Sequence, residues 1–187
     1  AMIVQEVEEN PWYFFREIAR SKEGEKLRAN RGNLAVWWLA LTHTDYYLIQ
    51  IRQTGKTNTD DALDNYVLHC AGWDTNINKL TKDQSLRAAN IQNIKEMRDH
   101  LPAYLNPYDK NKDKNNTEEI TCEARNNHMR IYVGQSSPGA AYKTGRGHTA
   151  AINKGDEGPF TDNARISIPS MITSGTSARD LAAKRGG

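Results

Sequence analysis

The sequence lacks the features that mark disulfide-stapled, metal-cluster and membrane-spanning proteins. Its two cysteines, Cys70 and Cys122, lie far apart and form no CxxC pair, so neither a disulfide framework nor a cysteine-based metal site is expected. The five histidines show no metal-ligand spacing either. No signal peptide and no apolar run of about 18 residues occurs, so we expect a cytoplasmic protein without a membrane segment.

Apolar residues are also scarce, at 37% of the 187 residues. That length suits one domain with a real core, and the low apolar share predicts a compact core with long, polar loops. The formal net charge of +2 neither demands nor excludes nucleic acid as a partner, because a local basic face matters more than the sum.

Helical and strand patterns alternate along the chain. They predict an α/β fold in which helices flank a central, mainly parallel sheet. Asn33 is a candidate cap for the second helix, and the last helix is either interrupted or entered at Pro169. The polar segment 108–116 is expected to be a mobile loop. The expected helices are 12–20, 34–41, the segment from the first strand's turn to about 71, 84–100 and 164–173; the expected strands are 46–51, 75–80, the hairpin 120–125 with 129–133, and 149–153.

The tripeptide Gly55-Lys56-Thr57 matches the second half of the phosphate-binding loop Gly-x-x-x-x-Gly-Lys-[Ser/Thr], although Gln50 stands at the first glycine position. It lies between a candidate strand and a candidate helix, as the loop requires. There the backbone N–H groups bind phosphates, the lysine supplies charge and the hydroxyl holds magnesium. The alternative is a strand-to-helix turn without a chemical role.

Magnesium and hydrolysis both call for carboxylates, and Asp156-Glu157 follows the expected strand 149–153. Asp156 is the candidate for the magnesium shell, and Glu157 for polarising the attacking water. Arg146, between two glycines, is the candidate for stabilising charge on the transferred phosphate, with Arg52 as its rival. Solvated loop residues are the alternative reading of each.

Two further patterns point to ligands less directly. The aromatic pair Trp37-Trp38 and the cluster from Trp12 to Phe15 could stack an adenine ring, although core packing is the more frequent use of such residues. Residues 109–120 mimic the spacing of a calcium loop. Lys114 replaces its glycine and Ile120 its final glutamate, which excludes calcium there.

Taken together, the motifs resemble the ATPase domain of the large terminase, the motor that packages DNA into the heads of tailed bacteriophages. In that family the loop lacks its first glycine, and a Ser-Ser-Pro segment, an Arg-Gly pair and an Asp-Glu pair follow it in order. Residues 10–15 and 28–33 look most like the version from very large phages. The matching residues are Arg52-Gln53-Thr54-Gly55-Lys56-Thr57, Ser136-Ser137-Pro138, Arg146-Gly147 and Asp156-Glu157.

The resemblance implies a RecA-like P-loop NTPase of the ASCE type, with ATP and magnesium as cofactors. It implies that Glu157 and Arg146 are catalytic and that Thr57 and Asp156 hold magnesium. Phosphates are bound by Arg52, Gln53, Thr54, Gly55, Lys56 and Thr57, and adenine by Arg28, Arg31 and Asn33. After the Asp-Glu pair, the family has a helix and a Ser-Gly turn, similar to Ser174-Gly175.

The implied partners are double-stranded DNA, a portal protein and a small terminase subunit, with a homo-oligomeric ring on the portal and no membrane. The implied location is the host cytoplasm, at the procapsid. We expect residues 1–187 to form a single N-terminal ATPase domain that is cut short and lacks the nuclease domain, and hence to hydrolyse ATP weakly alone. Two alternatives stay open: another P-loop enzyme, such as a helicase-like ATPase or a small-molecule kinase, and a catalytically weak nucleotide- or DNA-binding module.

Overall fold

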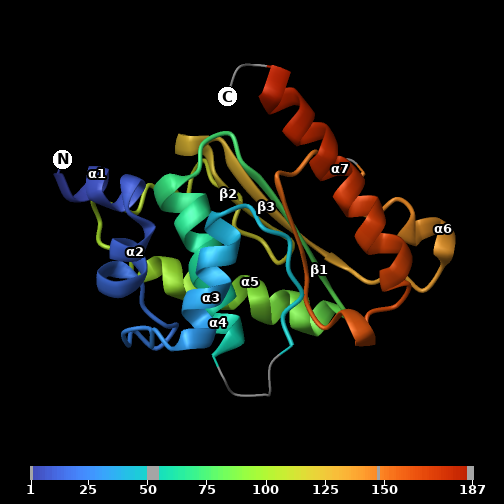
Figure 1. Cartoon of the computed structure of the whole chain (residues 1–187), viewed down its shortest axis with the longest axis horizontal. Helices are drawn as coiled ribbons and strands as arrows, with labels where there is room; N and C mark the ends of the chain where they lie inside the picture. Colours follow the sequence, from blue (N-terminus) through green and yellow to red (C-terminus); the bar gives the residue numbers. More distant parts are fainter. Residues whose placement is uncertain (1, 50–54, 147, 185–187) are drawn as a thin grey trace. The chain divides into compact units, whose positions relative to one another are not determined.

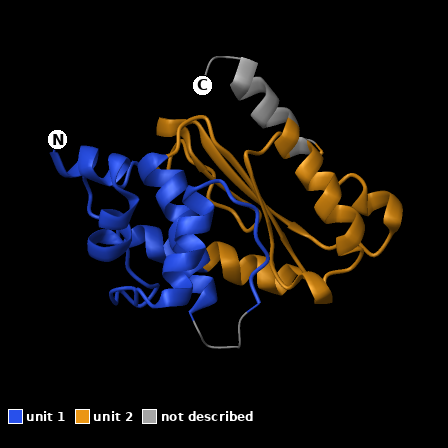
Figure 2. Cartoon of the chain, viewed as in Figure 1, with its two compact units in different colours: residues 1–71, 93–107 blue, residues 72–92, 108–187 orange. Residues whose placement is uncertain are grey.

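The computed structural model describes residues 2–49, 55–146 and 148–184 (Figure 1). The chain divides into two compact units (Figure 2). Unit 1 comprises Ala1–Ala71 and Asn93–Pro107, and unit 2 comprises Gly72–Gln92 and Tyr108–Gly187. Of the helices in the described ranges, none combines the length and the apolar character needed to cross a bilayer.

Unit 1 is helical. Its helices confirm the prediction of helices near 12–20 and 34–41 and after Gly55. Asn30, and not Asn33, caps α3, since the Asn30 side chain accepts a hydrogen bond from the Asn33 N–H at 2.9 Å. The elements are α1 (Met2–Glu9), α2 (Pro11–Tyr13) with a π-helical turn (Phe14–Ile18), α3 (Arg31–Leu41), and α4 (Lys56–Asn65) with a π-helical turn (Tyr66–Ala71).

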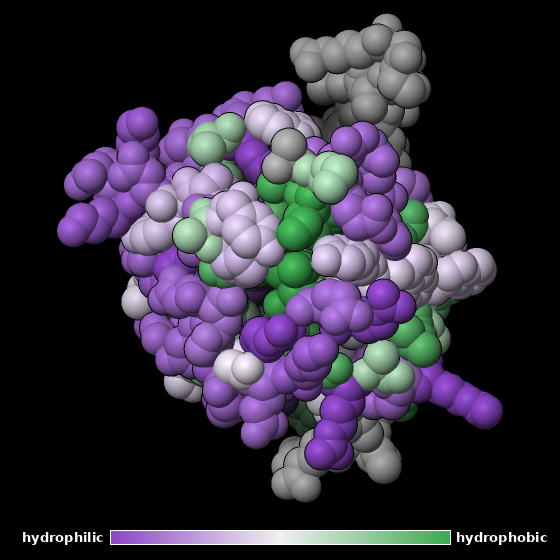
Figure 3. Space-filling model, turned by 90° about the vertical axis from the view of Figure 1, so that its left-hand side faces the viewer, coloured by the Kyte–Doolittle hydropathy of each residue, from purple (hydrophilic) through white to green (hydrophobic). Residues whose placement is uncertain are grey.

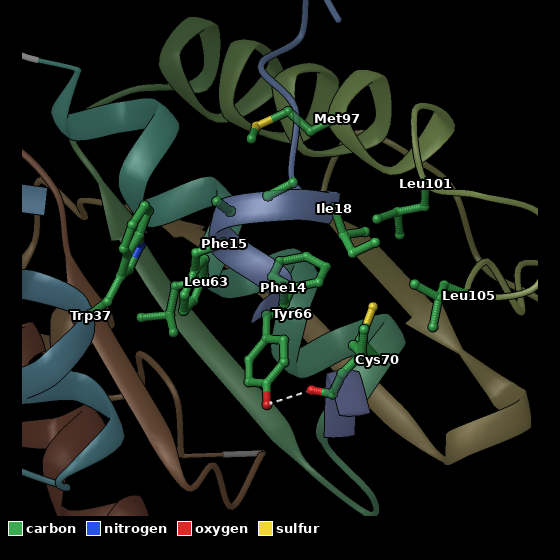
Figure 4. Packing of buried hydrophobic residues seen from close by; sticks show 13 residues of the cluster. Phe14, Phe15, Ile18, Trp37, Leu63, Tyr66, Cys70, Met97, Leu101 and Leu105 are labelled. Carbon is green, nitrogen blue, oxygen red and sulfur yellow. Dashed lines mark hydrogen bonds between the residues drawn. The ribbon is translucent and has the colours of Figure 1, made fainter. Parts of the chain in front are cut away.

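Aromatic rings form the centre of the unit 1 core. Phe15 stacks on Trp37 with centroids 4.1 Å apart, and Tyr66 packs against Phe15 and donates from its hydroxyl to the Val7 carbonyl at 3.1 Å (Figure 4). The Trp37 indole donates to the Thr59 carbonyl at 3.0 Å. These contacts fix α3 against α4 and thereby hold the start of α4.

Unit 2 contains a mixed, mostly parallel sheet of four strands in the order β2-β3-β1-β4. β1 pairs in parallel with β3 and with β4, and β2 pairs antiparallel with β3. The fold is therefore α/β, and the predicted hairpin and the strand near 75–80 are confirmed. The strands are β1 (Asn76–Thr81), β2 (Glu119–Cys122), β3 (Asn127–Val133) and β4 (Ile152–Gly155).

The predicted strand 46–51 is wrong over its described residues, because Tyr46 to Ile49 belong to no strand. Tyr47 is 96% exposed and Ile49 is 95% exposed. Aromatic and β-branched residues favour strands because they pack on a half-buried pleated surface. Without such a surface, their composition alone does not form one. Ile51 lies outside the described residues.

The fourth strand begins later than predicted and includes the polar residues Asn153 and Lys154. The register between β1 and β4 explains the polar residue Asn153, because it places Asn153 beside Asn78. The Asn78 side-chain amide donates to Asn153 Oδ1 at 3.3 Å. Hydrogen bonding between the two amides compensates for placing polar side chains on neighbouring strands.

The helices of unit 2 surround this sheet, and α7 packs against β4. The expected Ser174-Gly175 turn is wrong, because α7 continues through it. Gly175 instead permits close packing: a Cβ there would lie 2.7 Å from Asn153 Nδ2. The helices are α5 (Gln84–Asp99, as predicted, passing into unit 1 at Asn93), α6 (Pro138–Ala141), α7 (Ala164–Lys184) and 3-10 turns at Glu123–Arg125 and Gly158–Phe160.

The segment 108–116, expected to be mobile, is organised around the buried carboxylate of Asp113. Its oxygens accept hydrogen bonds from the N–H groups of Asp109 at 2.7 Å and Glu123 at 2.6 Å. A single acidic side chain thus ties a lysine-rich loop to the end of β2. Periodicity could not reveal this, because the contact depends on one residue.

Candidate functional site

The N-terminus of α4 has a backbone geometry that suits an anion. Gly55 caps the helix with φ of 82° and ψ of 15°, a left-handed conformation that glycine adopts without a steric penalty. A glycine cap offers no side chain to the first N–H groups of the helix, and the first turn has no acidic residue. These N–H groups and the helix dipole therefore favour a negatively charged ligand.

Lys56 and Thr57 are the first two residues of this helix and are half-buried. Behind them, the Gly55 carbonyl accepts from both the N–H and the hydroxyl of Thr59, at 3.0 and 2.9 Å. The second half of the proposed phosphate loop is thus fixed to α4. The other expected loop residues, Arg52, Gln53 and Thr54, lie outside the described residues.

The expected adenine-binding residues gather at the start of α3, also in unit 1. Arg28 and Arg31 are exposed, whereas Asn33 is buried. Asn33 donates from Nδ2 to the Arg28 carbonyl at 2.7 Å, and its Oδ1 has no hydrogen-bond partner among the described residues. A buried acceptor without a donor is costly, and this oxygen is enclosed by the protein.

A shallow apolar hollow of about 460 Å³ lies on unit 1, lined by Trp12, Leu34, Ala35 and Trp38. Trp37 does not line it, because that ring is 1% exposed and stacks on Phe15. The idea that Trp37 or Phe15 stacks an adenine is therefore wrong, and core packing is their role. On the face seen in Figure 3, apolar groups form a strip within a mainly polar surface.

The acidic pair occupies the carboxyl end of β4 in unit 2. The Asp156 N–H donates to the Leu80 carbonyl of β1 at 2.8 Å. Glu157 follows in a left-handed conformation, with φ of 52°, and its N–H donates to Asp156 Oδ1 at 3.1 Å. The Thr161 hydroxyl donates to the Glu157 carbonyl at 3.1 Å. Ligands of parallel sheets bind at this edge, and these hydrogen bonds hold the backbone of the pair there.

A lysine that was not predicted from the sequence forms an ion pair with the acidic pair. Lys82, directly after β1, places Nζ 2.9 Å from Glu157 Oε2, and both side chains are partly exposed. The carboxyl ends of the parallel strands β1 and β4 bring the two residues together. Lys82 follows a predicted strand, as Asp156 does, and the ends of parallel strands lie at one edge of a sheet. Its position in the sequence could therefore have indicated that it lies near Asp156.

Arg146 lies in the loop after α6, on the exposed surface of unit 2. Its Nε donates to Ser170 Oγ of α7 at 3.3 Å, and its guanidinium lies 5.9 Å from the centre of the Tyr142 ring. Ser170 was not identified from the sequence, because nothing local links a helical serine to a loop 24 residues earlier.

Three aspartates on α4 form a cluster that was not predicted from the sequence. Oxygen atoms of Asp60, Asp61 and Asp64 lie within 4.8 Å of one another, and Asp61 and Asp64 are buried. Oxygen ligands at this spacing could hold a divalent cation. Asp64 lies three positions after Asp61 and four after Asp60, so its side chain neighbours both on the helix surface. This spacing could have revealed the cluster in the sequence.

The chain matches no protein-family model and no curated protein sequence.

Proposed function

We propose that the chain is the ATP-binding and ATP-hydrolysing motor domain of a viral terminase, which drives double-stranded DNA into a procapsid. The observation that carries the proposal is the start of α4, where a left-handed glycine is followed directly by Lys56 and Thr57. The order of the Arg146 loop and the Asp156-Glu157 pair behind it supports a hydrolase over a simple anion site.

In this proposal each group has one role. Lys56 and the N–H groups of α4 bind the phosphates, Asn33, Arg28 and Arg31 bind adenine, and Glu157 orients the attacking water. Arg146 stabilises the charge of the transferred phosphoryl group. Magnesium, held by Thr57 and Asp156, would neutralise phosphate charge.

The proposed fold is a RecA-like P-loop NTPase of the ASCE type, and the parallel strands β1, β3 and β4 are compatible with it. The proposed partners are double-stranded DNA, a portal protein and a small terminase subunit. The motor would work as a homo-oligomeric ring on the portal, in the host cytoplasm.

The decisive experiment is calorimetry of ATP and magnesium binding, combined with phosphate release. Lys56→Ala should abolish nucleotide binding, because it removes the positive charge at the start of α4. Lys110→Ala, an exposed lysine of the loop in unit 2, is the matched control and should bind as the wild type does. Unchanged affinity in Lys56→Ala would refute the phosphate-loop assignment.

The same experiment separates binding from chemistry with Glu157→Gln. This change keeps the size of the side chain, so ATP binding should persist while turnover falls by about 100-fold or more. Equal losses of binding and turnover would instead mean that Glu157 is structural.

A nucleotide-binding module with poor hydrolysis is the second candidate, and the Lys82–Glu157 ion pair favours it. The lysine occupies a carboxylate oxygen that the proposed hydrolysis needs for orienting water. Phosphate release with and without double-stranded DNA distinguishes the candidates. DNA-stimulated release supports the motor and excludes a small-molecule kinase, whereas binding without any release supports the module.

A further inference from the structure

One turn of α7 contacts both catalytic segments of unit 2. At Ile168, the helix meets the end of β4, where a Cβ on Gly155 would lie 3.5 Å from Ile168 Cδ1. At Ser170 it meets Arg146, and at Met171 it meets Gly145. The strand that ends directly before Asp156 and the loop that carries Arg146 are thus packed against neighbouring residues of one helix.

The hydrogen bonds of Ser170 have a defined direction. Its hydroxyl donates to the Tyr142 carbonyl at 2.8 Å, and a hydroxyl has only one proton to donate. Its oxygen is therefore available as an acceptor for the Arg146 Nε–H at 3.3 Å. Ser170 is 5% exposed, so water competes little for either bond.

The loop cannot easily move away from this contact. Gly145 has φ of 77°, and a Cβ on it would lie 2.7 Å from Met171 Cγ, so the backbone of the loop lies directly against α7. The Tyr142 ring flanks the guanidinium. Among the described residues, only Nε of the Arg146 guanidinium has a hydrogen-bond partner, which leaves the terminal amino groups of Arg146 to bind phosphate oxygens.

We infer that Ser170 is a positioning residue that fixes the Arg146 guanidinium by its Nε and leaves its two terminal amino groups for the ligand. The inference rests on the proposed function, in which Arg146 stabilises the transferred phosphoryl group. Rigid placement matters there, because a donor that is already oriented spends no free energy on reorganisation during the reaction.

The contact itself is tested by NMR of the arginine Nε–H groups, with the Arg146 signal assigned by its loss in Arg146→Lys. In the wild type this proton should exchange slowly with water, and Ser170→Ala should make the exchange faster. Ser167→Ala is the matched control, since Ser167 is a buried serine on the same helix and should leave the Arg146 signal unchanged. A proton that exchanges equally fast in wild type and Ser170→Ala would overturn the inference.

The functional effect is tested by calorimetry with ADP and with ADP–aluminium fluoride, an analogue of the transferring phosphoryl group, both with magnesium. Ser170→Ala should leave ADP affinity unchanged and weaken the analogue by about 3- to 10-fold, the effect of one lost hydrogen bond to an oriented group. Ser170→Thr retains the hydroxyl and should restore analogue binding. Thermal unfolding confirms that each variant is folded, and Ser170→Cys replaces Ser170→Ala if the latter is not.

A double variant excludes a general packing effect. In an Arg146→Ala background, Ser170→Ala should cause no further loss of analogue affinity, because the residue through which it acts is gone. An additional loss, or equal losses for ADP and the analogue, would overturn the positioning role. Failure of the proposed function looks different: the wild type and Lys56→Ala would bind nucleotide equally or not at all, while the exchange measurement would still decide whether Ser170 holds Arg146.

Discussion

At the scale of single residues, the site depends on Gly55 for its conformation and not for space. A Cβ at this position would meet nothing within 4 Å, but φ is 82°. The same chain contains Gly139, within α6, where a Cβ also meets nothing and φ is not positive. The two glycines therefore separate backbone strain from steric fit.

Gly55→Ala should lower the free energy of unfolding by about 1 to 2 kcal/mol, because alanine is strained in the left-handed region. It should also weaken ATP binding, since relaxing the strain misaligns the first N–H groups of α4. Gly139→Ala should not destabilise the protein, because alanine favours a helix. Urea unfolding and calorimetry measure both effects, and equal stability of the two variants would contradict this account.

The residue scale is also where the sequence predicted the local geometry at the start of α4. Gly55, Lys56 and Thr57 are a local pattern, and the structure places them at a helix start as expected. Lys82 and Ser170 could not be found in that way. Each reaches its partner, Glu157 or Arg146, only after the sheet and α7 have formed, and no pattern of neighbours encodes that proximity.

At the scale of elements, the adjacent tryptophans Trp37 and Trp38 lie on the buried and the exposed face of the same helix. Trp37 is 1% exposed, whereas Trp38 is 56% exposed. Trp37 bridges α3 to the core through the Phe15 ring and to α4 through the Thr59 carbonyl. Successive helical positions point about 100° apart, so neighbours in sequence have different surroundings.

Trp37→Ala should therefore lower the free energy of unfolding by about 3 to 5 kcal/mol, through the loss of packing and the cavity that remains. Trp38→Ala should change it by less than about 0.5 kcal/mol. Chemical unfolding followed by circular dichroism measures both. A comparable loss in Trp38→Ala would mean that its exposed ring contributes to the core after all.

Elements with strong periodicity were predicted well, and those that depend on neighbours were not. The helix over Gln84–Asp99 and the β2–β3 hairpin follow their own patterns. The segment 46–49 has the composition of a strand and the exposure of a loop. Gly175 was predicted to lie in a turn, but it lies inside a helix. A Cβ at this position would be too close to Asn153 Nδ2, so close packing favours glycine there.

At the scale of the whole molecule, groups with shifted pKa values make stability depend on pH at both ends of the scale, and Glu119 and Tyr66 illustrate the two signs. Burial raises the pKa of Glu119 in unit 2, but hydrogen bonds and charges from Lys114 and Arg130 outweigh burial and leave it below the ordinary 4.5. In unit 1, burial raises the pKa of Tyr66 from 10.0 to about 12, with smaller contributions from the charges of Cys70 and Glu8.

The signs of the two responses are opposite. Glu119 has a lowered pKa when folded, so it stabilises the protein above pH 4.5, and this stabilisation is lost as the pH falls through the folded pKa. Tyr66 has a raised pKa, so its contribution is complete below pH 10 and is lost as the pH rises toward about 12. Unfolding free energies measured across pH should fall at both ends.

Two variants assign the ends. Glu119→Gln should make the acid limb less steep and leave the alkaline limb unchanged, and Tyr66→Phe should do the reverse, because neither replacement titrates. If Glu119→Gln left the acid limb as steep as in the wild type, the ion pairs with Lys114 and Arg130 would contribute nothing to folding.

The aromatic core of unit 1 also makes the protein its own optical probe. Of the four tryptophans, Trp12, Trp38 and Trp73 are 39%, 56% and 61% exposed, and only Trp37 is enclosed. Dissolved iodide should therefore quench the first three and spare Trp37. The fluorescence that remains in the presence of iodide comes from Trp37, whose ring stacks on Phe15 and donates a hydrogen bond to α4. Its emission wavelength and intensity therefore report on the helix that begins with Lys56.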